Sequence, residues 1–314
     1  MRLHVSSSPH IRDPVTTRRL MLDVVIALCP ALIASIVYFG YRAAVVVAVA
    51  VGSAVLFEFI SRRIMKRPQT IGDFSAVITG MLVAFNMPAT VPIYLPVIGS
   101  LIAIVVVKQM FGGLGQNFVN PALAARIILT ISFPAAMTLF VAPATAPGTD
   151  LVSSATPLAM LRNQFVPLPD YLDLFLGRGK AGCIGEVCIL ALLTGAVYLL
   201  IRRVITAWIP LFYLATVAIM VAIGGQDPLY HLLSGGLILG AFFMATDYVT
   251  SPLTNKGKII YGLGCGLLTG LIRLFGGMVE GVSFSILLMN ILVPHLDRWT
   301  RPVQFGGGLK HAKK

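Results

Sequence analysis

The sequence predicts an all-α polytopic membrane protein of about ten transmembrane helices, built from two inverted five-helix repeats at 20–141 and 183–296. Hydrophobic residues make up 57% of the 314 residues and charged residues only 11%, whereas soluble domains average about 25% charged residues. Long apolar runs recur along the chain, and short motifs of its first half return in its second. The composition excludes a soluble globule and a disordered chain, and the continuity of the runs excludes a membrane β-barrel.

A membrane-spanning helix needs about 20 mostly apolar residues. Ten segments fit this requirement, and polar, proline or glycine residues separate most of them. The third and tenth segments are short, so a partly re-entrant course stays open for them. The expected spans are 20–40, 43–60, 72–88, 92–108, 121–141, 183–201, 207–223, 229–246, 258–274 and 282–296.

Basic residues predict the orientation of these spans. The chain has 24 Lys and Arg against 12 Asp and Glu, a net charge of +12, and such residues collect in cytoplasmic segments of membrane proteins. With the N-terminus inside, 19 of the 24 fall on the cytoplasmic side. We therefore expect cytoplasmic ends at 1–19 and 297–314 and an extracytoplasmic loop at 142–182. The five basic residues on the outer side are Arg42, Arg162, Arg178, Lys180 and Arg273.

The same charge distribution bears on binding partners. A basic soluble domain would suggest nucleic acid, but topology already accounts for most of the charge, so we expect no nucleic-acid partner. The basic tail with Lys310, Lys313 and Lys314 is placed to touch anionic membrane lipid. Ordinary anchoring on the inner side explains this tail equally well.

Short motifs repeat between the two halves. Phe111-Gly112-Gly113 returns as Phe275-Gly276-Gly277, and Pro88 and Pro252 match at the same offset of 164 residues. Two halves with five spans each must insert in opposite orientations, which is the inverted-repeat pattern of many transporters. The alternative is that paired glycines after an apolar run are simply common in membrane helices.

The expected outer loop is by far the longest connection between spans, and long loops are usually functional or disordered. Its proline and glycine content favours turns over a further span, with a short helix expected near 158–165. It contains Asp150-Leu151-Val152-Ser153-Ser154-Ala155-Thr156-Pro157-Leu158. This stretch resembles the flavin-attachment site of the B-type and D-type membrane subunits of the Nqr and Rnf redox complexes. The family pattern is Ser/Thr-x-Ala-Thr, often with an Asp shortly before it and Pro-Leu after it.

The resemblance implies an FMN bound covalently to Thr156, which would make the chain a flavoprotein and a phosphoprotein. In the family, a dedicated flavin transferase joins a threonine hydroxyl to the FMN phosphate through a phosphoester bond. Ser153 and Ala155 fill the other specified positions, Ser154 is at the variable one, and Asp150 precedes them. Such a bond needs an exposed hydroxyl with small neighbours. The alternative is a chance tetrapeptide whose threonine caps a helix or a turn.

The N-terminal sequence extends the resemblance. Ser8-Pro9-His10 and the stretch at 17–31 resemble the opening of the D-type subunits of Rnf complexes (RnfD), and the family fits nearly the whole chain. The family implies a component of a redox-driven translocase in the bacterial cytoplasmic (inner) membrane, without stand-alone catalysis. The whole complex moves electrons between reduced ferredoxin and NAD⁺ and couples this to Na⁺ or H⁺ transport. Implied partners are the other membrane, flavin and iron–sulfur subunits and the flavin transferase.

Three other interpretations stay open. The chain is shorter at its N-terminus than the Nqr B-type subunits (NqrB), which favours the Rnf D-type, but an Nqr-type component of a Na⁺-translocating NADH:quinone oxidoreductase is the nearest alternative. A flavin-free transporter or channel with inverted repeats fits the span count equally well, and so does a structural scaffold. The outer-loop motif discriminates between them, because neither a permease nor a scaffold needs Thr156. The family is also associated with bound riboflavin, which no motif in this chain places.

Ionisable residues in or near spans are candidates for an ion pathway by default. Asp73, Asp247 and Glu280 lie close to the repeated motifs and are therefore the candidates for contact with the transported ion. The alternative for each is a solvated or paired position at the end of a span. No catalytic constellation and no spacing typical of metal ligands is present in the sequence.

Overall fold

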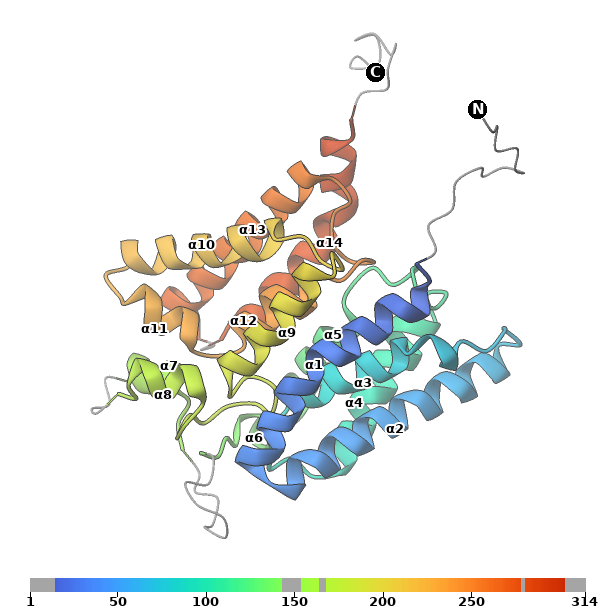
Figure 1. Ribbon diagram of the computed structural model, residues 1–314, viewed down its shortest axis with the longest axis horizontal. Helices are drawn as coiled ribbons and strands as arrows, with labels where there is room; N and C mark the ends of the chain where they lie inside the picture. The colour runs from blue at the N-terminus through green and yellow to red at the C-terminus, as the bar shows by residue number, and fades with distance from the viewer. Residues whose placement is uncertain (1–14, 143–153, 164–167, 278–279, 303–314) are drawn as a thin grey trace, which may run out of the picture.

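The computed structural model describes residues 15–142, 154–163, 168–277 and 280–302. The regular secondary structure in these ranges is helical, which confirms the predicted all-α fold (Figure 1). Three helices are long and apolar enough to cross a membrane, judged by length and composition. They are α1 (Thr17–Phe39), α2 (Tyr41–Ile64) and α13 (Asn255–Phe275).

The remaining helices are shorter, and they fall into three groups along the chain. The first half continues through η1 (Ile71–Asp73), α3 (Ser75–Phe85), α4 (Tyr94–Leu101), the π-helix η2 (Ile102–Gln109), α5 (Pro121–Ser132) and α6 (Pro134–Thr138). The predicted outer loop contains α7 (Pro157–Arg162) and α8 (Tyr171–Leu176). The second half, besides α13, consists of α9 (Ile189–Ile201), α10 (Trp208–Ile223), α11 (Pro228–Leu233), α12 (Leu237–Leu239), the π-helix η3 (Gly240–Met244) and α14 (Val282–Thr300).

Two expected spans are broken where the sequence predicts one helix. The span expected at 121–141 divides at Phe133, because Pro134 has no N–H with which to continue the α5 hydrogen-bond ladder. The span expected at 229–246 divides around Gly235, whose φ of +68° is strained for any residue with a Cβ. Both breaks lie at residue types that interrupt helices, proline because it lacks a backbone N–H and glycine because it adopts positive φ.

Other expected spans differ in length. The third, at 72–88, contains α3, which has only 11 residues, and the sixth, at 183–201, becomes helical only at Ile189. The tenth was expected to be short, which is wrong, because α14 continues for 19 residues to Thr300.

The two halves contact each other at small and amide side chains. A Cβ at Gly195 of α9 would lie 2.0 Å from the carbonyl oxygen of Ala27 in α1, so these helices approach as closely as only glycine allows. At the centre, Asn120 Nδ2 donates to the carbonyl oxygen of Met244 at 3.3 Å. Asn86 Nδ2 lies 3.8 Å from the Met244 sulfur. The ends of α3 and η3 and the start of α5 therefore meet at one methionine.

The repeated Phe-Gly-Gly motifs differ in backbone conformation. Gly112 and Gly113 have φ of +127° and +100°, so the first copy makes a tight turn that requires glycine. Gly276 has φ of −76° and ends α13. The sequence repeat is therefore not a repeat of local conformation at this motif.

The described part of the outer loop lies away from the start of α1 and the end of α14 (Figure 1). In Figure 1, α7 and α8 lie at the lower left, whereas the first turn of α1 and the last turn of α14 lie toward the upper right. The Tyr38 hydroxyl donates to the carbonyl oxygen of Leu176 at 2.7 Å and ties α8 to the first half. Tyr171 donates to Asp227 and ties α8 to the second half, and this hydrogen bond raises the pKa of Tyr171.

Candidate functional site

Thr156 is the N-cap residue of α7. Its Oγ1 accepts a hydrogen bond from the backbone N of Ala159 at 3.4 Å, beyond the usual range for such bonds. The residue is only 9% exposed, so the expectation of an exposed hydroxyl is wrong for this conformation. The reason is local, because Pro157 begins a helix whose Leu158 is buried. The short helix itself confirms the prediction for this part of the loop.

The motif neighbours of Thr156 are only partly described. Ser154 is half-buried, and its backbone N donates to the carbonyl oxygen of Phe140 at 3.1 Å. Ala155 is exposed. Ser153 and Asp150 lie outside the described residues.

Thr156 lines a cavity of about 480 Å³. Small-molecule sites in proteins have volumes of about 300–1,000 Å³ and combine apolar walls with a few polar groups. Residues from α5, α6, α7 and α14 form the wall of this cavity, and they combine apolar and polar side chains in the same way. Its apolar lining includes Ile127, Met137, Phe140 and Phe284, and its polar lining includes Asn86, Arg126, Thr130 and Glu280.

Arg126 and Glu280 form an ion pair in the wall of this cavity. Arg126 Nη2 donates to Glu280 Oε2, and Nη1 donates to the side-chain oxygen of Asn86 at 2.7 Å. The side chains of Arg126 and Glu280 are 12% and 18% exposed. Arg126 is one of the 19 basic residues predicted on the cytoplasmic side, but it lies within α5 and is held by a carboxylate. It therefore carries no information about sidedness.

Glu186 lies behind this pair, in the segment before α9, and is almost fully buried. Its Oε1 accepts from the backbone N of Cys183 at 2.8 Å, whereas its Oε2 has no hydrogen-bond partner among the described residues. A Cβ at Gly236 would lie 3.0 Å from this Oε2. The glycine at the break before α12 thus leaves room for the carboxylate.

Two basic residues assigned to the outer side are also buried near this cluster. Lys180 donates to the carbonyl oxygens of Glu186 at 3.1 Å and Leu233 at 2.9 Å. Arg273 donates to three carbonyl oxygens, those of His231, Ser234 and Glu280. Neither is a solvated loop charge, because both hold irregular backbone at the interrupted helices.

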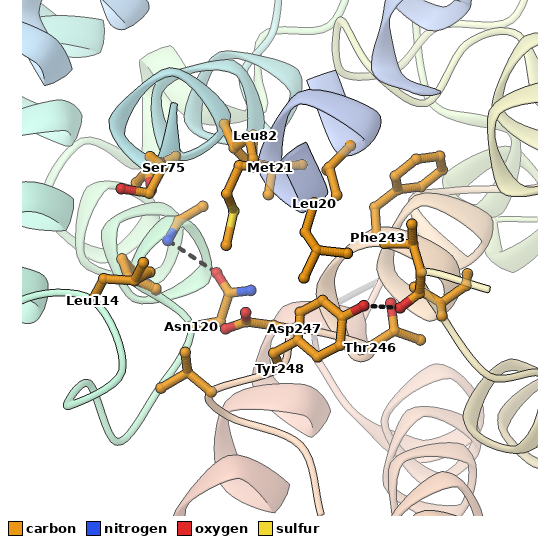
Figure 2. A pocket seen from close by; sticks show the side chains of 18 of the residues that line it. Leu20, Met21, Ser75, Leu82, Leu114, Asn120, Phe243, Thr246, Asp247 and Tyr248 are labelled. Carbon is orange, nitrogen blue, oxygen red and sulfur yellow. Dashed lines mark hydrogen bonds between the residues drawn. The ribbon is translucent and has the colours of Figure 1, made fainter. Parts of the chain in front are cut away.

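Asp247 lies in a second, smaller cavity of about 90 Å³, to which both halves contribute. Figure 2 shows Asp247 beside Asn120 and Tyr248, with Leu20 and Met21 of α1, Ser75 and Leu82 above these three residues. The Asp247 carboxylate accepts from Thr250 Oγ1 at 3.0 Å. Lys108 also lines this cavity.

Asp73 is placed differently again. Its Oδ1 accepts from the backbone N of Ser75 at 2.8 Å and from the Ser75 hydroxyl at 2.6 Å, at the start of α3. The three candidates for ion contact are therefore not brought together. Asp73 is at a helix start, Asp247 is in the smaller cavity, and Glu280 is in the cavity that contains Thr156.

A buried network centred on Glu58 was not predicted. Lys108 Nζ donates to Glu58 Oε2 at 3.0 Å and to the Ser75 hydroxyl at 2.6 Å. Glu58 Oε1 accepts from Thr70 at 2.8 Å and Gln109 at 3.2 Å. The presence of Glu58 and Lys108 inside apolar runs was the available signal in the sequence. The two residues are 50 positions apart, and a single sequence does not reveal that such distant residues pair.

Comparisons with known proteins identify the same family over nearly the whole chain. The family model described as "NQR2, RnfD, RnfE family" matches residues 4–306. The D subunit of the Na⁺-translocating ferredoxin:NAD⁺ oxidoreductase complex of Acetobacterium woodii is 51% identical over 98% of this chain and 96% of its own. The D subunit of the proton-translocating ferredoxin:NAD⁺ oxidoreductase complex of Clostridium ljungdahlii is 42% identical over 96% of each chain. The D subunit of the ion-translocating oxidoreductase complex of Cronobacter sakazakii is 36% identical over 98% of this chain and 99% of its own.

Proposed function

Because this chain belongs to the NQR2, RnfD, RnfE family, we propose that it is the D-type membrane component of an Rnf-type, ion-translocating ferredoxin:NAD⁺ oxidoreductase complex. Three relatives named as D subunits, covered almost end to end, support this over the Nqr-type alternative. The chain would relay electrons within the bacterial cytoplasmic membrane rather than catalyse a reaction alone. Its partners would be the other membrane, flavin and iron–sulfur subunits.

We propose further that Thr156 carries a covalent FMN. The observation that carries this proposal is that the threonine of the Ser-x-Ala-Thr motif lines a cavity of about 480 Å³, large enough for a small-molecule cofactor. Its residues fit a flavin in kind, because apolar side chains suit the faces of a ring system and polar ones suit its edge. Glu280 Oε1 in the same wall has no hydrogen-bond partner among the described residues.

The residues around the cavity would have different roles in holding the flavin. When bound, the flavin supplies the electron transfer, and the protein supplies position and electrostatics. Oγ1 of Thr156 would tether the cofactor through the phosphoester bond. Met137 and Phe284 would cover the ring and exclude water, while Asn86 and Thr130 offer hydrogen bonds to polar atoms.

The buried position of Thr156 has a consequence for attachment. A flavin transferase must reach Oγ1, so α7 has to be displaced during modification. The helix has six residues, and the bond from Ala159 to Thr156 is long. We therefore expect the transferase to act before α7 is packed in its final place. We assign no residue to a second, non-covalent riboflavin.

We propose ten spans in two inverted halves, with the termini inside and Thr156 outside. Support comes from the interrupted helices in both halves, which resemble the broken helices at the centre of inverted-repeat transporters. The ends of α3 and η3 both reach Met244. The separation of α7 and α8 from the first turn of α1 and the last turn of α14 also supports it (Figure 1).

The transported ion is left open in this proposal, since relatives are named for Na⁺ in one case and protons in another. Asp247 and Glu280 remain candidates for the ion pathway, because each lines a cavity to which both halves contribute. Asp73 has less support, because the Ser75 backbone and hydroxyl already occupy one of its oxygens.

Covalent flavin is tested by producing the chain together with its flavin transferase and viewing a denaturing gel under ultraviolet light. The wild-type band is expected to fluoresce, and Thr156→Ala is expected to give a dark band in the same membrane fraction. Ser154→Ala is the matched control, because it removes a hydroxyl at the variable motif position two residues away. A dark wild-type band, or a fluorescent Thr156→Ala band, would contradict the proposal.

A further inference from the structure

We infer that Arg126 is a positioning residue for the flavin on Thr156, an inference that rests on the proposed function. Its guanidinium group would hydrogen-bond to the carbonyl-bearing edge of the flavin ring and, through its positive charge, raise the reduction potential of the cofactor. The ligand class recognised is thus a planar heterocycle whose edge becomes more negative on reduction.

The geometry leaves Arg126 two N–H groups for a ligand, on Nε and on Nη1. Of its five N–H groups, one on Nη1 donates to Asn86, and those on Nη2 donate to Glu280 and, at 3.7 Å, to Cys183 Sγ, which fixes the plane of the guanidinium. Its Nε, by contrast, has no protein acceptor among the described residues, and the side chain lines the cavity that contains Thr156. A cation fixed at two nitrogens and open at the third is preorganised for a planar acceptor.

The other cations nearby cannot take this role. Lys180 and Arg273 already donate to backbone carbonyl oxygens and do not line this cavity. Arg126 is therefore the positively charged group in the described cavity wall.

The electrostatic effect should be large enough to measure. The Arg126 side chain is 12% exposed, and charges act more strongly away from water. Reduction adds electron density to the ring, so a fixed positive charge favours the reduced cofactor, in the way that oriented donors stabilise developing negative charge. Glu280 opposes this effect, so the pair would set the potential jointly.

The test is an anaerobic redox titration of the purified, flavin-loaded chain, followed by flavin absorbance, with covalent loading checked on a denaturing gel. Arg126→Gln is expected to lower the potential, shifting the reduced-to-oxidised ratio at a fixed potential at least tenfold, which is about 30 mV for a two-electron couple. Arg126→Lys keeps the charge and should shift it less. Thr138→Val, an uncharged change in the same cavity wall at a residue with no assigned flavin contact, should leave it unchanged.

The outcomes separate this inference from the function on which it rests. A wild-type chain without covalent flavin would remove the proposed function itself. A loaded Arg126→Gln variant with the wild-type potential would overturn the role of Arg126 alone, because a purely structural arginine changes stability and not potential. If Arg126→Gln carries no covalent flavin, the Glu280→Gln variant provides the test. It removes the charge that opposes Arg126, so it should raise the reduction potential of the flavin. An unchanged potential in Glu280→Gln would overturn the inference.

Discussion

Two buried charged clusters differ in how completely their carboxylates are paired. In the first, both oxygens of Glu58 accept hydrogen bonds, and the ion pair with Lys108 is 0% and 2% exposed at the two side chains. In the second, Glu186 Oε2 and Glu280 Oε1 have no hydrogen-bond partner among the described residues. The first joins α2 to η2 within one half, whereas the second connects the two halves beside a cavity.

This difference separates a structural role from a functional one. A buried polar atom without a partner costs about 1–3 kcal/mol, so native proteins retain few of them. The Glu58 cluster avoids this cost at its carboxylate, and its atoms without a hydrogen-bond partner are Gln109 Oε1 and Arg62 Nε. In the Arg126–Glu280–Glu186 cluster, two carboxylate oxygens carry this cost. The cluster lies next to Thr156 and the broken helices, where a cofactor or an ion would supply the missing partner.

The largest expected effect is in the Glu58 cluster. Lys108→Met removes one of the two cations beside the buried Glu58 carboxylate, the other being Arg62, whose Nε lies 3.7 Å from Glu58 Oε1. Breaking a buried ion pair typically destabilises a protein by about 3–5 kcal/mol. The loss should be seen as earlier thermal unfolding in detergent. Glu58→Gln combined with Lys108→Met should recover part of it, since the buried carboxylate charge is removed as well and Arg62 keeps its hydrogen bond to the carbonyl oxygen of Pro68. If Lys108→Met alone is as stable as wild type, the Glu58–Lys108 pair does not contribute to the stability of the fold.

A smaller loss of stability is expected in the second cluster. Arg126→Gln removes charge-assisted hydrogen bonds worth about 1.5–3 kcal/mol, and partial exposure of the pair lets water replace some of them. The same unfolding measurement should show a smaller loss for Arg126→Gln than for Lys108→Met. A larger loss of stability for Arg126→Gln than for Lys108→Met would contradict the assignment of the structural role to the Glu58 cluster.

Paired glycine substitutions sharpen the account of the first cluster. Gly113 has φ of +100°, and a Cβ there would lie 2.6 Å from Arg62 Nη2. Gly115 has φ of +92°, with open space around it. Both alanine variants carry backbone strain, but only Gly113→Ala also displaces the guanidinium of Arg62, which is paired with Glu58, so Gly113→Ala should unfold at the lower temperature. Equal unfolding temperatures for the two variants would argue against a close contact at Arg62.

The smallest expected effect is at Thr156 in a chain without flavin. Thr156→Ala removes the N-cap of α7, which costs about 1 kcal/mol, while Thr156→Ser keeps an acceptor and should cost less. Hydrogen exchange of the Ala159 amide reports on this end of α7 directly. Unchanged exchange in Thr156→Ala would mean that the cap contributes nothing.

The sequence predicted those features that depend on neighbouring residues. Apolar runs predicted α1, α2 and α13, and a short helix was expected near 158–165, where α7 lies at Pro157–Arg162. Pro134 and the glycines at 235 and 236 carried a visible signal for the breaks in two expected spans, although each was predicted as one helix. The π-helical geometry of η2 and η3 has no comparable local signal.

The candidate site depends on contacts that one sequence cannot show. Arg126 is 154 positions from Glu280, and nothing in their local sequence indicates that they share a cavity with Thr156. The position of Arg126 within an apolar run indicated only that its charge needs a partner. Pairing, cavity volume and the burial of Thr156 all depend on how α5, α7 and α14 pack.

The central claim is that Thr156 holds a flavin in the cavity beside Arg126. Peptide mass mapping of the chain purified from its membrane with the transferase present tests this most directly. We expect the peptide that contains Thr156 to carry the mass of an FMN phosphoester, with fragmentation placing it on that residue and with the Thr156→Ala peptide unmodified. An unmodified Thr156 in chain taken from a complex that is active in electron transfer would contradict the account.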